Sequence, residues 1–488
     1  MTAFLGFNIA TSGLFTARTA LDVTAHNITN ANTKGYSRQI VEQRATRALP
    51  AAGKGMIGTG SEVYGINQMR DFYLDTKYWS ENSILGQYSV KKTQLSLMES
   101  LFNEPSDSGF NAIFNSFFDA INGVVNNADS GEHRAALKEA AVTFTQYFNT
   151  TAQHLKKYQR DLNFEIKTKV EEINVIARKI QDLNQQIYKY EMDGSKANDL
   201  RDERAKLVDQ LSKIVNVEVE EIEVNPEVKN GNLSGVDYRD KSEKHFRVKI
   251  NGQILVDHFN ATELRVVPRK TPNNPEDVEG LYDIQWANGL KFDITDPNLS
   301  GELKGYIDMR DGNGTMYKGI PYYLNRLNEF VRTFARAVNE GLDRNGDDIA
   351  DLEGGHLNAI NSEGKKGIYF FTYKENGEAK GTNELDDPLD YDNITAENFS
   401  LSKDILENVG NIAAASDGES LPSGNGFMEG LKALRNYTHL FREGTADSYM
   451  NSIISELGIN AKQANMMEAT QTNITMAVEN QRMSVSGV

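Results

Sequence analysis

The sequence predicts a multi-domain α+β protein, in which a long helical-bundle domain built from both chain ends carries inserted β-rich outer domains. The chain has 488 residues, which is more than a single hydrophobic core usually organises. Apolar residues recur at helical spacing near both ends and through residues 76–216. At Val217 the spacing changes to two, the period of a half-buried strand.

The amino end carries four large apolar residues spaced seven apart, with small residues between them. These four residues, here called the seam, are Phe7, Leu14, Leu21 and Ile28. Their 3.5-residue period is typical of a helix that lies against other helices. An isolated helix of this length is marginal in water. We therefore expect residues 1–36 to form a polymerisation helix that is disordered in the free chain and becomes ordered when copies assemble.

The composition excludes several classes of protein. With 52 basic and 69 acidic residues the net charge is -17, which argues against a nucleic-acid partner. The chain has no cysteine, which rules out disulfides, thiol catalysis and thiolate metal sites. It has no apolar run long enough for a membrane span, and its first residues do not resemble a Sec-type leader. We expect neither a membrane partner nor a cofactor.

The helical pattern predicts a core domain from residues 76–216, 300–341 and 428–488, after a β-rich connector at 37–75. Breaks are expected at residues 103–105 and 128–131. Residues 152–192 and a shorter second helix that carries Leu200, Leu207, Leu211 and Ile214 predict an antiparallel helical hairpin, because Asp193-Gly194-Ser195 separates them. Its expected core consists of Ile166, Ile173, Ile180, Leu183, Ile187, Leu207 and Leu211, with Tyr190 at the end of the same face. An intermolecular coiled coil is the alternative to this intramolecular hairpin.

Two further regions are predicted outside the core domain. Residues 217–299 form a β-rich outer domain, in which Asn251-Gly252 and Asn288-Gly289 predict hairpin turns into residues 254–256 and 290–294. Residues 342–427 are rich in Gly, Asp, Asn and Ser. They predict either a small second outer domain or a long ordered excursion.

The segment NITNANTKGYSRQ begins at Asn27 and contains the last seam residue, Ile28. Asn side chains tolerate left-handed backbone and bond exposed backbone groups, and Gly35 adopts such backbone freely. We expect this segment to end the helix and to fix the angle at which it leaves the body. Copies can pack into a tube only if each leaves its body at the same angle.

Three patterns invite a more specific chemical interpretation, and each fails on context. Residues 53–58 spell GxGxxG with Asp75 beyond, but Pro50 precedes them and strand-like residues follow, whereas a dinucleotide site needs a strand before and a helix after. Residues 343–347 are acidic, but their spacing excludes an EF-hand; a looser carboxylate site remains as the alternative to a turn. The seven histidines show no metal-ligand spacing. We expect no catalytic residue and no metal site.

The run SGLFTARTALDVTAHNITNANTKGYSRQ resembles the amino-terminal signature of bacterial flagellar rod, hook and hook-associated proteins. Asn27, Asn30, Thr33, Gly35, Tyr36 and Arg38 carry this axial-protein motif, together with Leu14, Leu21 and Ile28. Residues 101–120, 198–219 and 478–488 narrow the resemblance to the hook-associated members that join hook and filament. Residues 301–311 and 325–343 are similar to the middle segment of the same members.

This resemblance implies a secreted, non-enzymatic structural subunit at the hook-filament junction, exported without a cleaved signal. Its partners would be copies of itself in a helical ring, the hook protein below, the second junction protein above and a flagellar export chaperone. The family continues past the SVSGV motif with a further helix, which places the chaperone site beyond Val488. The alternatives are another axial protein, of hook or flagellin type, or a secreted adhesin or hydrolase that uses the β region.

Overall fold

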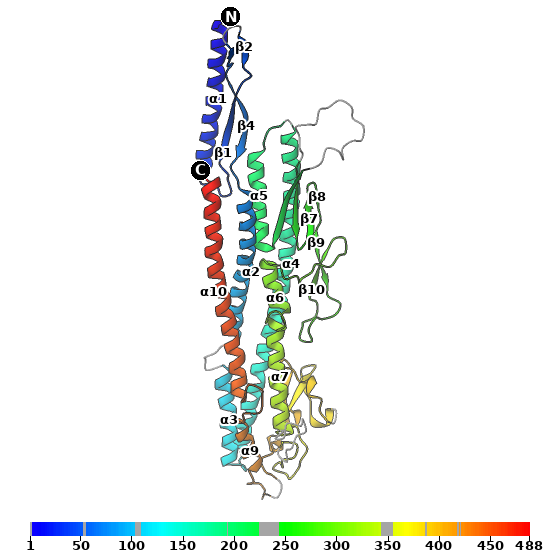
Figure 1. The fold of residues 1–488 in the computed structure, drawn as a ribbon. Helices are drawn as coiled ribbons and strands as arrows, with labels where there is room; N and C mark the ends of the chain where they lie inside the picture. Colours follow the sequence, from blue (N-terminus) through cyan, green and yellow to red (C-terminus); the bar gives the residue numbers. More distant parts are fainter. Residues whose placement is uncertain are drawn as a thin grey trace.

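The computed structural model shows an elongated molecule whose long helices run alongside one another, with small sheets along one side (Figure 1). It describes residues 2–51, 55–102, 109–192, 194–223, 244–342, 355–385, 388–416, 419 and 421–488. The helices are α1 Thr2–Asn30, α2 Phe72–Phe102, α3 Phe110–Asn126, α4 Gly131–Glu191, α5 Asn198–Ile214, α6 Glu302–Asp311, α7 Ile320–Asn339, α8 Lys403–Glu407, α9 Gly426–Leu434 and α10 Ala446–Ser486. The predicted multi-domain α+β class is confirmed.

The strands form several small sheets. They are β1 Gln39–Ala45, β2 Leu49–Ala51, β3 Gly55–Ile57, β4 Ser61–Gln68, β5 Val217–Glu223, β6 Lys244–Ile250, β7 Gln253–Asp257, β8 Asn260–Ala261, β9 Leu264–Pro268, β10 Tyr282–Trp286, β11 Phe371–Glu375, β12 Glu378–Ala379 and β13 Phe399–Leu401. β1 pairs with β4 and β2 with β3, so that residues 39–51 and 55–68 form a long ribbon beside α1. α2 begins at Phe72, inside the region predicted as the connector.

α4 and α5 form the helical hairpin. The side chains of Ile166, Ile173, Ile180, Leu183, Ile187 and Leu211 are buried, and that of Leu207 is half-buried. Tyr190 is 64% exposed, so its prediction as a core residue was wrong. It lies in the last turn of α4, next to Glu191, where the helix ends. Lys169, the polar residue within the pattern, pairs with Glu302 of α6 at 2.8 Å.

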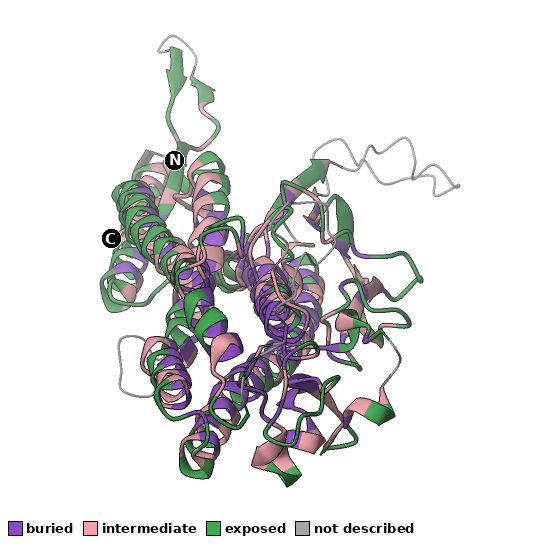
Figure 2. Ribbon diagram, turned by 90° about the horizontal axis from the view of Figure 1, so that it is seen from below, coloured by how far each residue is buried: buried purple, intermediate pink, exposed green. Residues whose placement is uncertain are grey.

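Two hydrophobic cores follow one another along α4, and Figure 2 shows buried residues gathered between the helices. The first, here called the aromatic core, includes Phe110, Phe114, Phe117, Phe144, Phe148, Phe330 and Phe334. The second contains the isoleucines of the hairpin and Trp286. Truncation of one buried Phe to Ala typically costs 3–5 kcal/mol. Packing of this kind is the main source of rigidity in a chain without disulfides.

A polar layer on α4 separates the two cores. Gln159 Nε2 donates to the carbonyl of Arg310 at 2.9 Å, and Arg310 Nη1 donates to Asn163 Oδ1 at 2.8 Å. Arg310 is 1% exposed and pairs with Asp311. Burial raises the pKa of Asp311, but Arg310 and Arg269 outweigh it and hold the pKa below its usual range. A buried charge needs such partners, and the layer fixes the register of α6 on α4.

The β region is partly as predicted. β5 to β8 form a four-stranded sheet, and β6 turns into β7 through Asn251 and Gly252, whose φ values of 49° and 70° fit a type I′ turn. At Asn288-Gly289 the turn exists, but the predicted partner strand at 290–294 is reduced to single contacts such as the Gln285–Lys291 bridge. β10 pairs instead with β9, which the sequence pattern did not indicate.

The described part of residues 342–427 packs on the aromatic core. Phe371 and Phe399 belong to it, and the Phe371 ring centroid lies 6.0 Å from that of Phe334 on α7. These residues therefore share one hydrophobic core with α3, α4 and α7. The acidic residues 343–347 lie outside the described residues.

Gly55–Ile57 form β3 opposite β2, whereas a dinucleotide site needs a helix at this position, and Gly53 and Lys54 lie outside the described residues. Within the described ranges, no cluster of three or more His, Cys, Asp or Glu residues could hold a metal ion. None of the helices within those ranges is long and apolar enough to cross a membrane.

We predict that His356 makes stability depend on pH. Burial lowers its pKa from 6.5 to about 4; its Nδ1 lies 2.7 Å from the Ile368 carbonyl, and its Nε2 accepts from Ala413 N–H at 2.9 Å. The unfolded chain binds a proton near pH 6.5 and the folded chain only near pH 4, so the free energy of unfolding should fall by ~3 kcal/mol as pH drops across this interval. Urea unfolding at several pH values measures this slope.

His356→Gln should lose this part of the slope, because Gln has no imidazole to titrate. The control His439→Gln changes an exposed residue and should keep the slope of the parent protein. Equal slopes for the parent and His356→Gln would contradict the assignment.

Candidate functional site

α1 has two unlike faces. The seam residues Phe7, Leu14, Leu21 and Ile28 are 66%, 67%, 70% and 67% exposed. The opposite face lies on the ribbon of β1 and β4 and buries Thr16, Val23 and Asn27. Thr16 Oγ1 donates to the Ser61 carbonyl at 3.3 Å. α1 therefore contacts its own chain mainly through polar groups and leaves its large apolar side chains outside.

Asn27 ties the end of α1 to the start of β1. Its Oδ1 accepts from Gln39 N–H at 2.9 Å and from the Tyr36 hydroxyl at 2.7 Å, and its Nδ2 donates to the Gln39 carbonyl at 2.9 Å. Asn30 accepts from the Thr33 hydroxyl, and Gly35 has φ of +86°, which L side chains rarely adopt. The motif residues thus reverse the direction of the chain, and hydrogen bonds from their side chains hold the turn.

Asp202 of α5 holds the same turn against the body. It accepts from Ser37 N–H at 2.8 Å and from the Ser37 hydroxyl at 2.7 Å, and Arg70 lies 3.4 Å from it. Burial raises the pKa of Asp202, while the Ser37 bonds and Arg70 oppose that rise. Burial, with the nearby Asp199 and Asp202, also raises the pKa of Tyr36 to about 12. The hydroxyl therefore keeps its proton for the bond to Asn27 at neutral pH.

Arg482 connects the carboxyl-terminal helix, α10, to α5 and α2 beside this turn. It pairs with Asp209 of α5 at 2.9 Å and with Asp75 of α2 at 3.3 Å, and Asp75 also pairs with Arg70. Burial alone would lower the pKa of Arg482, but Asp209, Asp75 and Glu479 raise it. The motif residue Arg38 donates its backbone N–H to Ser486 at 2.7 Å. We call residues 27–39 together with Arg70, Asp75, Asp202, Asp209 and Arg482 the joint.

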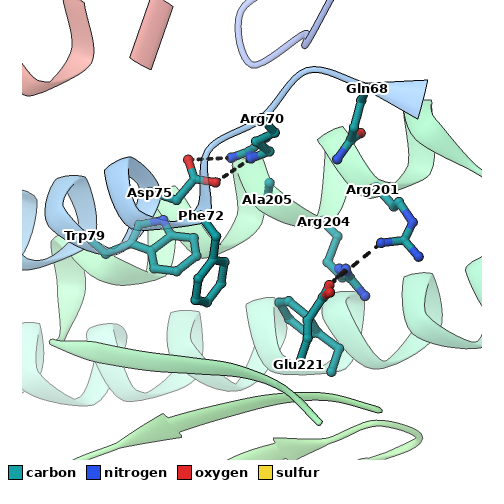
Figure 3. A pocket seen from close by; sticks show the side chains of 10 residues that line it. Gln68, Arg70, Phe72, Asp75, Trp79, Arg201, Arg204, Ala205 and Glu221 are labelled. Atoms are coloured by element: carbon teal, nitrogen blue, oxygen red, sulfur yellow. Dashed lines mark hydrogen bonds and ion pairs between the residues drawn. The ribbon is translucent and has the colours of Figure 1, made fainter. Parts of the chain in front are cut away.

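A cavity of about 380 Å³ lies beside the joint, between the start of α2, α5 and the β5–β6 strands (Figure 3). Its arginines are already paired: Arg70 with Asp75, Arg201 with Glu191 at 2.7 Å, and Arg204 with Glu221 at 3.1 Å. These pairs neutralise the charge that an anionic ligand would need. The cavity therefore gives no support to a catalytic or anion-binding site.

The structure brings the predicted motif residues together, and the seam runs from Ile28 beside them along the exposed face of α1. Asn27, Asn30, Thr33, Gly35, Tyr36 and Arg38 all lie at the turn between α1 and β1. The hairpin residues form a separate core farther along α4. Sequence reasoning missed Arg70, Asp75, Asp202, Asp209 and Arg482. The last three lie within segments that carried the family resemblance, and this was the available signal.

Two family models match parts of this chain, one over the helical body and one over α1 with its motif. The family model for the helical domain of the flagellar hook-associated protein FlgK matches residues 95–357, more than half of the chain. The chain belongs to the FlgK family. FlgK proteins are structural components of the bacterial flagellum, and so is this member. A second model, for the flagella basal body rod protein, matches residues 7–36, which contain α1 and the motif.

Individual relatives support the family assignment. Flagellar hook-associated protein 1 of Bacillus subtilis is 28% identical over 503 residues, covering 99% of this chain and 90% of that protein. The protein of the same name from Salmonella typhimurium is also 28% identical, but the match covers 75% of this chain and 59% of the relative. The solved structure of the flagellar hook junction protein FlgK from Burkholderia pseudomallei has the same fold, with a TM-score of 0.63 at 14% identity, covering 84% of this chain and all of that one.

We predict that Asn27→Ala loosens the joint without unfolding the body. Three hydrogen bonds to the Asn27 amide would be lost, leaving buried groups of Gln39 unsatisfied, a change that typically costs 1–3 kcal/mol. Backbone exchange at Gln39 should accelerate by about ten-fold or more in hydrogen-exchange mass spectrometry.

The exposed Asn32 offers a matched control. Asn32→Ala should leave exchange at Gln39 as it is, and neither variant should change exchange in the middle of α4. Unchanged protection at Gln39 in Asn27→Ala would show that the amide does not hold the turn.

Proposed function

We propose that the protein forms the junction between hook and filament by self-association of its terminal helices. The observation that carries the proposal is the exposure of all four seam residues along one face of a single helix, α1. Apolar surface is worth about 25 cal/mol per Å² when removed from water. Copies that cover one another's seam would gain this free energy around a helical ring.

The joint supports this proposal because it determines how α1 leaves the body. The contacts of Asn27, Asp202 and Arg482 come from α1, α5 and α10, so that α1, once neighbouring copies order it, leaves the helical core in one direction. Identical directions in all copies are a requirement for a closed ring. Of the hydrophobic residues of α1 whose side chains are described, only Val23 is buried. We infer that residues 1–36 gain most of their order on assembly.

The same proposal assigns a role to each segment of the chain. Residues 1–36 polymerise, residues 37–75 connect, and the helical core of residues 76–216, 300–341 and 428–488 makes contacts between copies. Residues 217–299 lie outermost. The subunit is secreted by the flagellar export route and acts without catalysis. It contacts the hook protein below and the second junction protein above, and an export chaperone binds the carboxyl end.

We predict that Leu14→Glu combined with Leu21→Glu abolishes junction assembly and leaves the free subunit folded. Both side chains are exposed in the single chain, but in the assembly each would carry an unpaired carboxylate into an apolar contact. Electron microscopy of cells that express only the variant should show hooks without filaments. Circular dichroism and thermal unfolding of the purified protein should match the parent.

Phe164→Glu serves as the control, because Phe164 is 63% exposed on α4, away from the seam. Cells with this control should bear filaments. Normal filaments in cells that carry the Leu14 and Leu21 changes would refute the proposal.

A further inference from the structure

α4 carries a row of amide side chains on the face that contacts β7, β8, β9 and β13. The row, here called the amide row, consists of Asn149, Gln159, Asn163, Asn174, Gln181 and Asn184. Gln181 is half-buried, and each of the others is at most 9% exposed. Successive asparagines of the row are 14, 11 and 10 residues apart, close to whole turns of a helix with 3.6 residues per turn. The row therefore follows one side of α4, along which Figure 1 shows β7 to β10.

Asn174 binds the main chain of a single residue, Leu264, at the start of β9. The Leu264 N–H donates to Asn174 Oδ1 at 2.8 Å, and Asn174 Nδ2 donates to the Leu264 carbonyl at 2.8 Å. Two strand residues that face each other in an antiparallel sheet exchange the same pair of hydrogen bonds. The Asn174 side chain thus takes the place of a neighbouring strand.

The other members of the amide row also bond main-chain groups of segments that lie on α4. Asn163 and Gln159 accept N–H groups, whereas Asn184, Gln181 and Asn149 donate to carbonyls. The bonded residues are Tyr282, Val278, His258, Phe259, and Ala396 with Phe399, in the order of the members just named. Every residue except proline carries both main-chain groups, so these bonds do not depend on the side chains of the bonded segments.

Apolar packing alone does not determine where these segments lie along α4. Leu264, Ile284 and Trp286 pack in the same core as the isoleucines of the hairpin. Those isoleucines recur every seven residues, and apolar contact is not directional. A segment that moved along α4 by one repeat would meet a similar apolar surface.

The amide row does not repeat in this way. A move of seven residues toward the end of α4 would place Tyr282 N–H opposite Val170 instead of Asn163. It would also place the His258 carbonyl opposite Glu191 instead of Asn184. Val170 offers no hydrogen bond, and a glutamate carboxylate does not donate to a carbonyl. The amides therefore distinguish one position along α4 from the others.

We propose that the amide row positions the outer β region on α4 by binding its main chain, whatever side chains the bonded residues carry. The members of the row are positioning residues, and the apolar core supplies most of the stability. The outer surface of the molecule can then change in sequence while its placement on the helical core is kept. This inference goes beyond the proposed function, because it concerns contacts within one chain and holds whether or not copies self-associate.

The test measures the distance between α4 and β9 in the purified full chain. The chain has no cysteine of its own, so spin labels can be attached at Thr168→Cys and Arg265→Cys, both exposed positions. Double electron–electron resonance should give one narrow distance distribution. Asn174→Leu, which keeps a similar side-chain volume, should broaden this distribution or displace it by about 5 Å or more, one turn of α4. Circular dichroism should show unchanged helix content.

Two control variants separate recognition of the main chain from recognition of side chains. Leu264→Met keeps the N–H and carbonyl that Asn174 binds, and it conserves volume. Gln186→Leu removes an exposed amide of α4 that lies outside the row. Both variants should give the distance distribution of the labelled parent.

Gln181→Leu provides a second variant at a half-buried position, in case Asn174→Leu does not fold. It removes the bond to the Phe259 carbonyl at 2.7 Å, and labels at Thr168→Cys and Asn260→Cys report its effect. Parent-like distributions in the folded amide variants would overturn the proposal. A displacement in Leu264→Met as large as that in Asn174→Leu would also overturn it, because the side chain would then determine the placement.

Discussion

The position of the terminal helices on the body depends on one set of ion pairs. It runs from Asp202 through Arg70 and Asp75 to Arg482. Each member is shielded from solvent and has its counter-charge in the next. Removing one member of a buried pair typically costs 3–5 kcal/mol, because its partner stays behind unpaired. Ser37 attaches the amino-terminal turn to this chain of charges, and the Arg38 N–H donates to the Ser486 carbonyl at the end of α10. The direction of α1 is therefore set by directional bonds, which allow less rotation than apolar packing would.

The body beneath the joint is suited to transmit that direction. α4 runs through both hydrophobic cores, and its polar layer between them holds Arg310 with bonds to Asn163 and Asp311. In a purely apolar interface, α6 could shift along α4 by one turn with a modest loss of stability. Here such a shift would leave the buried Arg310 guanidinium without its hydrogen-bond partners. The register of α6 on α4 is consequently unique. Aromatic packing stabilises the body, and the polar layer selects one register between α6 and α4.

The elements that the sequence predicted well are those determined by neighbours in the chain. The isoleucine repeat of α4 and the Asn251-Gly252 turn depend on local periodicity and local backbone preference. The elements it missed depend on distant partners. β10 pairs with β9 instead of with the residues that follow its own turn. Ser37 donates a hydrogen bond to Asp202, which lies 165 residues away in the sequence. Periodicity carries no information about such pairings. Only the family resemblance marked the segments that contain Asp202 and Arg482, and it assigned them no contact.

α1 inverts the usual arrangement of an amphipathic helix. Its inward face uses Thr16 and Asn27 to bond backbone groups of the ribbon, and its outward face holds Phe7, Leu14 and Leu21. Contacts with its own chain stabilise such a helix only a little, because each hydrogen bond to the ribbon replaces a bond to water and the net gain in free energy is small. Under the proposed self-association, the larger gain comes from a neighbouring copy that covers the seam. The free subunit then does not depend on the seam, and the helix becomes ordered with its neighbours.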